Sequence, residues 1–174
     1  NELQDGHFSI IGFYERRARR ILPALFFVML ACLPFAWLWL FPKDLKRFTD
    51  SILAVIFFLS NHLFSNQSSY FDSATELKPL LHTWSLSVEE QYYLLFPLIL
   101  MFAWKLGQRW VLAILLAIII ASLLTAQWLS GAKPELAFYI LPTRAWELLI
   151  GGLVALYVTN AQRWPASIKI NQWG

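Results

Sequence analysis

Long apolar runs separated by short polar segments dominate the chain. Residues 21–41 and 110–132 contain no acidic or basic side chain, and at about 1.5 Å per residue each run can cross a hydrocarbon core of about 30 Å. Three further runs, at 48–64, 85–104 and 141–160, reach spanning length only with polar residues included. The pattern predicts an all-α fold, a polytopic membrane helical bundle in which residues 1–174 are part of one domain with five spans.

The composition agrees with a membrane protein and narrows its chemistry. Hydrophobic residues make up 58% of the chain and charged residues 14%, outside the usual range of soluble domains. The net charge of +3 comes from residues scattered between the apolar runs, which argues against nucleic-acid binding. Cys32 is the only cysteine, so neither a disulfide framework nor a cysteine-rich metal site is expected, and we expect no metal.

A cluster of arginines stands immediately before the first apolar run, in the segment "FYERRARRILPALF". One interpretation is a topogenic signal, which places the cluster on the cytoplasmic side. The other is a phosphate site, because Arg17 and Arg20 share a helical face and can grip phosphate oxygens. Alternation of five spans then brings this cluster, the segment 82–93 and the pair at 144 and 147 to the same membrane face. The longest polar segment, 65–83, is predicted to be an ordered loop or a re-entrant element.

Two adjacent carboxylates, Glu89 and Glu90, lie four or five residues inside the predicted third span. An unpaired charge inside a bilayer is costly, so both cannot easily face lipid. At about 100° per residue, Glu89 shares a helical face with Ser85 and Tyr93, whereas Glu90 aligns with leucines. Glu89 is therefore the predicted inward-facing group. For each carboxylate, interaction with the positive end of the helix dipole is the alternative.

The last predicted span repeats this pattern of charge near the start of an apolar run. In "LPTRAWELLIGGLVAL", Arg144 and Glu147 are three residues apart and share a helical face. They form either an internal ion pair or a site where Arg144 neutralises an anionic ligand and Glu147 holds it in place. The adjacent Gly151 and Gly152 permit close approach of another helix.

Three segments together resemble a known family: "FYERRARRILPAL", "LKPLLHTWSLSVEEQYYLLFP" and "TRAWELLIGGLVAL". They are similar to membrane acyltransferase family 3, the bacterial O-acetyltransferases of O-antigen and other cell-envelope polysaccharides. The resemblance implies transfer of an acyl group, usually acetyl, from cytoplasmic acyl-CoA to a carbohydrate hydroxyl. It also implies a multi-pass protein of the bacterial inner (cytoplasmic) membrane, with the lipid bilayer and an envelope carbohydrate as partners.

The resemblance also assigns residues. The family's arginine motif falls on Arg17 and Arg20, with Arg16 and Arg19 an alternative in the same spacing, and its glutamate falls on Glu89. Its His-Thr-Trp-Ser-Leu segment falls on residues 82–86. The catalytic candidates are His82, Ser85 and Glu89. The substrate-binding candidates are Arg16, Arg17, Arg19, Arg20, Trp84, Tyr93, Arg144 and Glu147.

One part of the family pattern has no counterpart in the chain. The family's first span carries a basic residue followed eleven positions later by a histidine thought to be catalytic, and none of the three histidines here has Lys or Arg at that distance. We therefore expect a fragment that lacks the first spans, is inactive alone and has the missing helices of the same domain as partners. A polytopic transporter and an inactive truncated scaffold are the alternatives, because intramembrane Glu, Arg and His also mark ion pathways.

Overall fold

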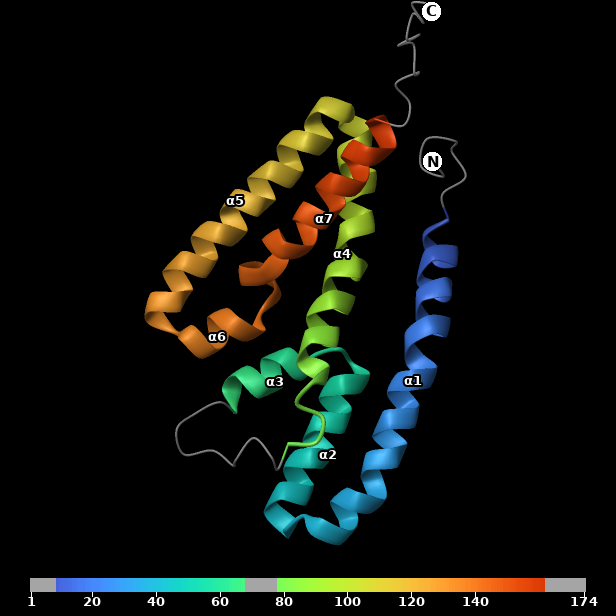
Figure 1. Ribbon diagram of the computed structural model, residues 1–174, viewed down its shortest axis with the longest axis vertical. Helices are drawn as coiled ribbons and strands as arrows, with labels where there is room; N and C mark the ends of the chain where they lie inside the picture. The colour runs from blue at the N-terminus through green and yellow to red at the C-terminus, as the bar shows by residue number, and fades with distance from the viewer. Residues whose placement is uncertain (1–8, 68–77, 162–174) are drawn as a thin grey trace, which may run out of the picture.

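The computed structural model describes residues 9–67 and 78–161, and every regular element in those ranges is a helix. The helices are α1 (Ile10–Trp39), α2 (Pro42–Ile56), α3 (Ser60–Asn66), α4 (Thr83–Leu106), α5 (Gln108–Ala132), α6 (Pro134–Tyr139) and α7 (Leu141–Ala161) (Figure 1). The predicted all-α fold is confirmed. Much of the polar segment expected at 65–83 lies outside the described residues.

Three helical stretches in the described part of the chain are long and apolar enough to cross a membrane. They are Ile10–Trp39, Arg109–Ala132 and Pro134–Val158, the last shared by α6 and α7. The sequence predicts five spans. α4 has the length, with 24 residues, but the polar run at 89–91 lowers the hydropathy of its first half. α2 has 15 residues, which at about 1.5 Å each fall short of a hydrocarbon core of about 30 Å.

The structure corrects the span predicted at 48–64, which is two helices rather than one. α2 ends at Ile56 and α3 begins at Ser60. Between them Phe58 has a φ of 53°, a left-handed conformation that a right-handed helix cannot continue through. The chain turns there, and α3 leaves at a steep angle to α2 (Figure 1). The local sequence contains neither glycine nor proline, so no ordinary breaker marks this turn.

α1 begins well before the apolar run that predicted it. Its first turn is capped by Ser9, whose Oγ accepts from the backbone N–H of Gly12 at 3.2 Å, and it continues to Trp39 through Pro23 and Pro34. The arginine cluster therefore lies within the helix instead of preceding it. The side chains of the cluster project from α1 at fixed angles, and only some of them can reach a neighbouring helix.

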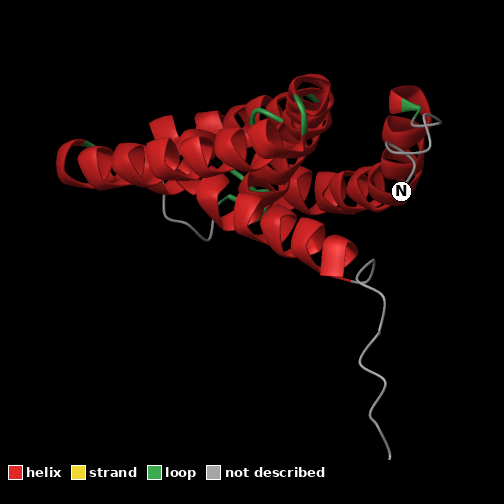
Figure 2. Cartoon of the chain, turned by 90° about the horizontal axis from the view of Figure 1, so that it is seen from above, coloured by secondary structure: helices red, strands yellow, loops and turns green. Residues whose placement is uncertain are grey.

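Packing divides the bundle into two apolar clusters with α4 between them. Leu25, Phe48 and Leu80 belong to the first cluster, and Leu115 and Leu149 belong to the second. Seen from above, the helices form an extended array with the N-terminal end of α1 at its edge (Figure 2). Many large apolar side chains lie on the outside, which is typical of a surface that contacts lipid.

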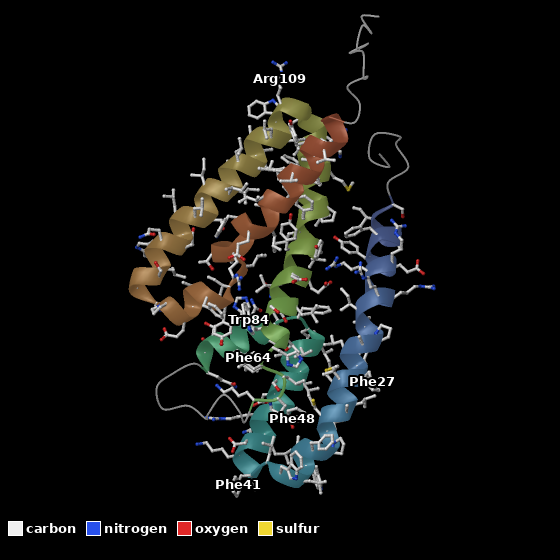
Figure 3. All side chains as sticks on the ribbon, viewed as in Figure 1. Phe27, Phe41, Phe48, Phe64, Trp84 and Arg109 are labelled. Atoms are coloured by element: carbon white, nitrogen blue, oxygen red, sulfur yellow. The ribbon has the colours of Figure 1, made fainter. Side chains whose placement is uncertain are left out.

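The side-chain view in Figure 3 locates the two ends of this apolar surface. Phe41 lies at one end of the molecule and Arg109 at the other, and Phe27, on α1 between them, is 72% exposed. Because an outer surface this apolar would be unstable in water, the arrangement agrees with helices that cross a bilayer.

The glycine pair of α7 offers a test of helix packing with a built-in control. A Cβ on Gly152 would lie 3.2 Å from Cζ of Phe96 in α4, whereas a Cβ on Gly151 would meet nothing within 4 Å. We expect Gly152→Leu to lower the free energy of unfolding by about 1–3 kcal/mol by overpacking. Gly151→Leu should not lower the melting temperature in detergent, because leucine favours a helix more than glycine does. Equal losses in the two variants would contradict the close approach of α4 and α7.

Candidate functional site

An ion pair between Arg17 of α1 and Glu90 of α4 joins these two helices. The guanidinium Nη2 donates to Glu90 Oε1 at 2.8 Å, and Nε donates to Oε1 at 3.0 Å and to Oε2 at 3.2 Å. The arginine side chain is 22% exposed and the glutamate side chain 13%. The guanidinium carbon lies 3.2 Å from the centre of the Tyr93 ring, so the cation is also held against an aromatic face. Both contacts restrict the position of Arg17.

A half-open cavity of about 430 Å³ lies beside this ion pair. α1 lines it with one face that includes Tyr14, Arg17 and Ile21, and the turn at 57–59 and α4 supply the other walls. Tyr14 Oη donates to the backbone carbonyl of Leu94 at 2.8 Å and so bridges α1 and α4 a second time. We call this space the α1–α4 cavity.

The residue after Glu90 holds the opposite wall of the α1–α4 cavity. Gln91 Nε2 donates to the carbonyl of Phe58 at 2.7 Å and to Oδ1 of Asn61 at 2.9 Å. The Asn61 amide donates to the carbonyl of Tyr139 in α6 at 3.1 Å. Asn61 is fully buried, and a buried amide requires such partners. The amide network therefore fixes the break between α2 and α3 against α4 and α6.

Hydroxyl groups continue this polar connection between α3 and α4. The Oγ atoms of Ser60 and Ser87 lie 2.7 Å apart, and Thr83 Oγ1 donates to Ser60 Oγ at 3.2 Å. All three side chains are buried. Every buried side-chain nitrogen and oxygen in the described residues has a hydrogen-bond partner, so these groups pin α3 to α4 without leaving an unsatisfied polar atom.

A second, smaller cavity of about 80 Å³ lies on another side of α4. Arg144 of α7 pairs there with Glu147, with Nη2 2.8 Å from Oε2, so the ion pair expected from their spacing is formed. The Arg144 guanidinium carbon lies 5.0 Å from the centre of the Trp84 ring. The cavity lining is Trp84, Ser85, Val88, Glu89, Arg144, Glu147 and Leu148. With two carboxylates and one guanidinium, this site carries a formal charge of −1 and does not favour an anion.

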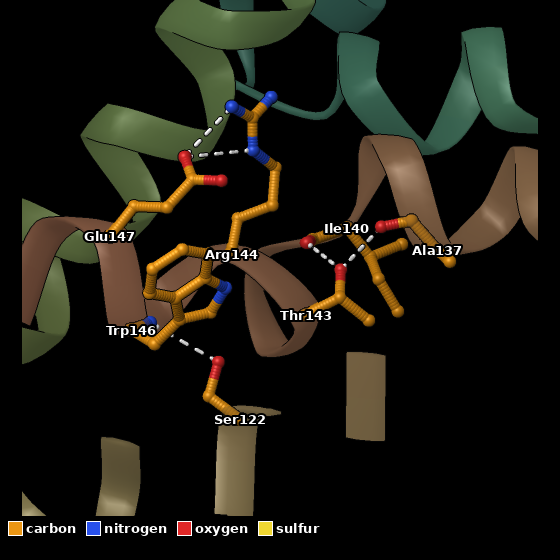
Figure 4. Close-up of polar contacts among 7 residues, drawn as sticks. All are labelled: Ser122, Ala137, Ile140, Thr143, Arg144, Trp146 and Glu147. Carbon is orange, nitrogen blue, oxygen red and sulfur yellow. Dashed lines mark hydrogen bonds and ion pairs between the residues drawn. The ribbon is translucent and has the colours of Figure 1, made fainter. Parts of the chain in front are cut away.

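The start of α7 is fixed from two sides, as Figure 4 shows. Thr143 Oγ1 donates to the carbonyls of Ala137 at 2.6 Å and Ile140 at 2.8 Å. Ser122 Oγ of α5 accepts from the backbone N–H of Trp146 at 3.1 Å. Because these bonds hold both sides of the first turn, Arg144 has a defined position relative to α5 and α6.

The structure corrects the orientation expected of the two adjacent glutamates. Glu90 carries the ion pair to α1, whereas Glu89, predicted to face inward, is exposed beside Arg144 and Glu147. Consecutive helical side chains diverge by about 100°, so the pair reaches two different neighbours. Periodicity gives the angle between the side chains but not which neighbouring helix lies on each side.

The other candidates are distributed over both cavities and the outer surface. Ser85 and Glu89 line the smaller cavity with Trp84, while His82 is exposed at the start of α4, where its carbonyl accepts from Ser85 Oγ at 3.3 Å. Arg16, Arg19 and Arg20 are exposed, and Arg19 pairs with Glu15 in its own helix at 2.7 Å. Of the four arginines, Arg17 lines the α1–α4 cavity.

Sequence reasoning found Arg17 and Tyr93, which line the larger cavity, but missed other groups that shape it. Glu90, Gln91 and Asn61 were each visible as polar residues within or next to apolar runs. A polar side chain within an apolar run needs a hydrogen-bonding partner inside the bundle, so their position in the sequence could have indicated these residues. Among the described residues, no group of three or more His, Cys, Asp or Glu side chains could hold a metal ion.

The helices of the chain form a bundle with an apolar exterior, and its polar groups lie around α4. These features define a polytopic membrane protein. A family model described as an acyltransferase domain matches residues 4–171. The chain therefore belongs to this family, acyltransferase family 3, and the resemblance carried by its three segments is confirmed.

The names of two similar proteins are consistent with this family. An uncharacterised protein of Haemophilus influenzae is 35% identical over 98% of this chain and 72% of its own length. A putative peptidoglycan O-acetyltransferase of Bacillus subtilis is 34% identical over 95% of the chain, and the peptidoglycan O-acetyltransferase OatA of Listeria monocytogenes is 34% identical over 82%. The matches cover 27% and 24% of the lengths of these two relatives. No solved structure matches the chain.

Proposed function

We propose that the chain is part of a membrane O-acetyltransferase that moves an acetyl group from acyl-CoA to a hydroxyl of a cell-envelope carbohydrate. Family membership and two relatives named as peptidoglycan O-acetyltransferases support the reaction type. The observation that carries the proposal is the α1–α4 cavity, which is lined by Arg17 of the arginine cluster. In this proposal the protein is a multi-pass protein of the bacterial inner membrane, and the arginine cluster faces the cytoplasm.

The proposed reaction is transfer between a thioester and an alcohol. The acceptor oxygen attacks the thioester carbonyl, the ester C–O bond forms, the C–S bond breaks, and the thiolate leaves. A base takes the hydroxyl proton and returns it to the thiolate, while donors stabilise the oxyanion. We assign Glu89 to orient the base, with His82 and Ser85 beside it at the exposed start of α4.

In this proposal the residues of the arginine cluster have different roles. Arg17 is already held by Glu90, so its charge is compensated. The exposed Arg20, one turn further along α1, then supplies the charge that meets the phosphate groups of the donor. Arg16 and Arg19 remain further candidates in the same spacing.

The experiment uses the complete gene product in proteoliposomes with acetyl-CoA labelled in its acetyl group. We expect label to be transferred to a carbohydrate acceptor and free CoA thiol to be released. Arg20→Ala should raise the KM for acetyl-CoA by about tenfold, equivalent to about 1.4 kcal/mol of lost donor binding. Arg109→Ala is the matched control, because this exposed arginine lies beyond the far end of α4 (Figure 3). Absence of transfer by the unaltered protein, or equal KM values in both variants, would contradict the proposal.

A further inference from the structure

The α1–α4 cavity has walls of two kinds. Most of its lining is apolar, from Ile21 and Leu22 of α1, Phe57 and Phe58 of the turn, and Leu94 of α4. Its polar groups are the Arg17–Glu90 pair, which lies against the Tyr93 ring, and Gln91, which holds the opposite wall. An apolar pocket of roughly 300–1,000 Å³ with a few convergent polar groups is the usual form of a small-molecule site, and the volume of about 430 Å³ lies within that range.

The cavity is held open by long side chains rather than by packed helices. The Arg17–Glu90 pair and the bond from Tyr14 Oη to the carbonyl of Leu94 span the distance between α1 and α4. Gln91 holds the turn on the other side through the carbonyl of Phe58. The adjacent residues Glu90 and Gln91 therefore position opposite walls, which means that the cavity is formed before any ligand enters. Such preorganisation reduces the entropy lost on binding.

The charge at the polar end selects the kind of ligand. Glu90 neutralises Arg17, so an entering phosphate or carboxylate would meet a second negative group at close range. A guanidinium has five N–H donors, and Glu90 accepts from Nε and Nη2 alone. The ion pair thus offers hydrogen bonds without net charge. An uncharged amide or thioester carbonyl fits this end better than an anion does.

We propose that the α1–α4 cavity binds the uncharged, amide-bearing thiol arm of the acyl donor and leaves the donor's phosphates outside at the exposed arginines. This inference rests on the proposed function, since it takes the donor to be a CoA thioester. Apolar segments of the arm contact the walls, and its amide carbonyls accept from Arg17. Glu90 and Gln91 are positioning residues, because they act on the ligand through the walls that they hold.

Filling the cavity from α4 tests this assignment. Leu94 lines the cavity and Leu98, one turn further along the same helix, does not, although both are about half exposed. In the complete gene product we expect Leu94→Trp to raise the KM for acetyl-CoA at least tenfold with little change in kcat. Leu98→Trp should leave both constants unchanged. Ile21 lines the same cavity from α1, so Ile21→Trp should have the same effect as Leu94→Trp. Agreement between the two variants would exclude a folding defect in one of them as the cause.

Two partial ligands separate the arm from the phosphates. Pantetheine should inhibit the unaltered protein and lose its effect on Leu94→Trp. Adenosine 3′,5′-bisphosphate should lose its effect on Arg20→Ala and keep it on Leu94→Trp. Equal KM values in Leu94→Trp and Leu98→Trp, or unchanged inhibition of Leu94→Trp by pantetheine, would overturn the assignment. So would a phospholipid that native mass spectrometry finds bound to the unaltered protein and absent from Leu94→Trp while the KM stays the same.

A direct measurement of pantetheine binding tests the cavity assignment separately from the proposed function. Isothermal titration of the unaltered protein with pantetheine should show binding that Leu94→Trp abolishes and Leu98→Trp retains. A protein that binds pantetheine in this way but transfers no acetyl group would refute the proposed function and leave the cavity assignment standing. A protein that transfers acetyl groups but shows no difference between the two tryptophan variants would refute the cavity assignment alone.

Discussion

Replacing Glu90 with alanine is expected to lower the free energy of unfolding by about 3 kcal/mol, near the lower end for a buried ion pair that loses one partner. The guanidinium of Arg17 would then remain against Tyr93, mostly shielded from water and without its counter-charge. The measurement is the melting temperature of the purified protein in detergent. Arg19→Ala is the control, because the Arg19–Glu15 pair is exposed, at 79% and 56%, and exposed pairs contribute little.

A double variant separates the structural role of this pair from its role in binding. Replacing both partners with apolar residues, Arg17→Met with Glu90→Leu, removes the uncompensated charge and should restore most of the lost stability. It also removes the donors at the polar end of the α1–α4 cavity, so the double variant should bind pantetheine more weakly than the unaltered protein does. A double variant that melts as early as Glu90→Ala, or a Glu90→Ala variant as stable as the unaltered protein, would refute this account.

The second large effect is expected at Asn61. Asn61→Leu keeps the volume of the side chain but leaves the amide of Gln91 and the carbonyl of Tyr139 with lost partners inside the bundle. Each unsatisfied buried polar group costs about 1–3 kcal/mol, so a loss of about 2–4 kcal/mol is expected. Hydrogen exchange should also show faster opening of α3 and of the turn at 57–59.

The same helix supplies the control for this substitution. Asn66, at the other end of α3, is exposed, and Asn66→Leu should change neither the melting temperature nor the exchange of the turn. If Asn61→Leu melts like Asn66→Leu, the amide network does not hold α3 in place. A loss of stability in both variants would also contradict a role specific to Asn61, and it could not come from helix propensity, because leucine favours a helix more than asparagine does.

The helices α5 and α7 could be predicted because hydropathy alone determines them. Runs at 110–132 and 141–160 lie within one or two residues of α5 and α7, since a continuous apolar segment in a bilayer has no alternative to internal hydrogen bonding. The break after Ile56 could not be predicted, because the left-handed conformation of Phe58 depends on partners in α3 and α4 rather than on a local glycine or proline.

The candidate site was predictable in its residue types and not in its pairing. The arginine cluster and the segment around Glu89 were found from their sequence position, and Arg144 with Glu147 from their spacing. The partner of Arg17 is 73 residues away, a separation over which periodicity carries no information. Helical phase placed Glu89 and Glu90 on different faces, but only the arrangement of α1 and α7 around α4 decides which carboxylate meets an arginine.

The adjacency of Glu90 and Gln91 has a mechanical consequence for the molecule. Because both walls of the α1–α4 cavity are tied to one peptide unit of α4, a rotation of this helix would strain both sets of bonds together. The position of α4 is therefore fixed from two sides. α1 is joined to α4 by the side chains of Tyr14 and Arg17 and carries prolines at positions 23 and 34. Any adjustment of the cavity to ligands of different length would therefore have to come from α1 rather than from α4.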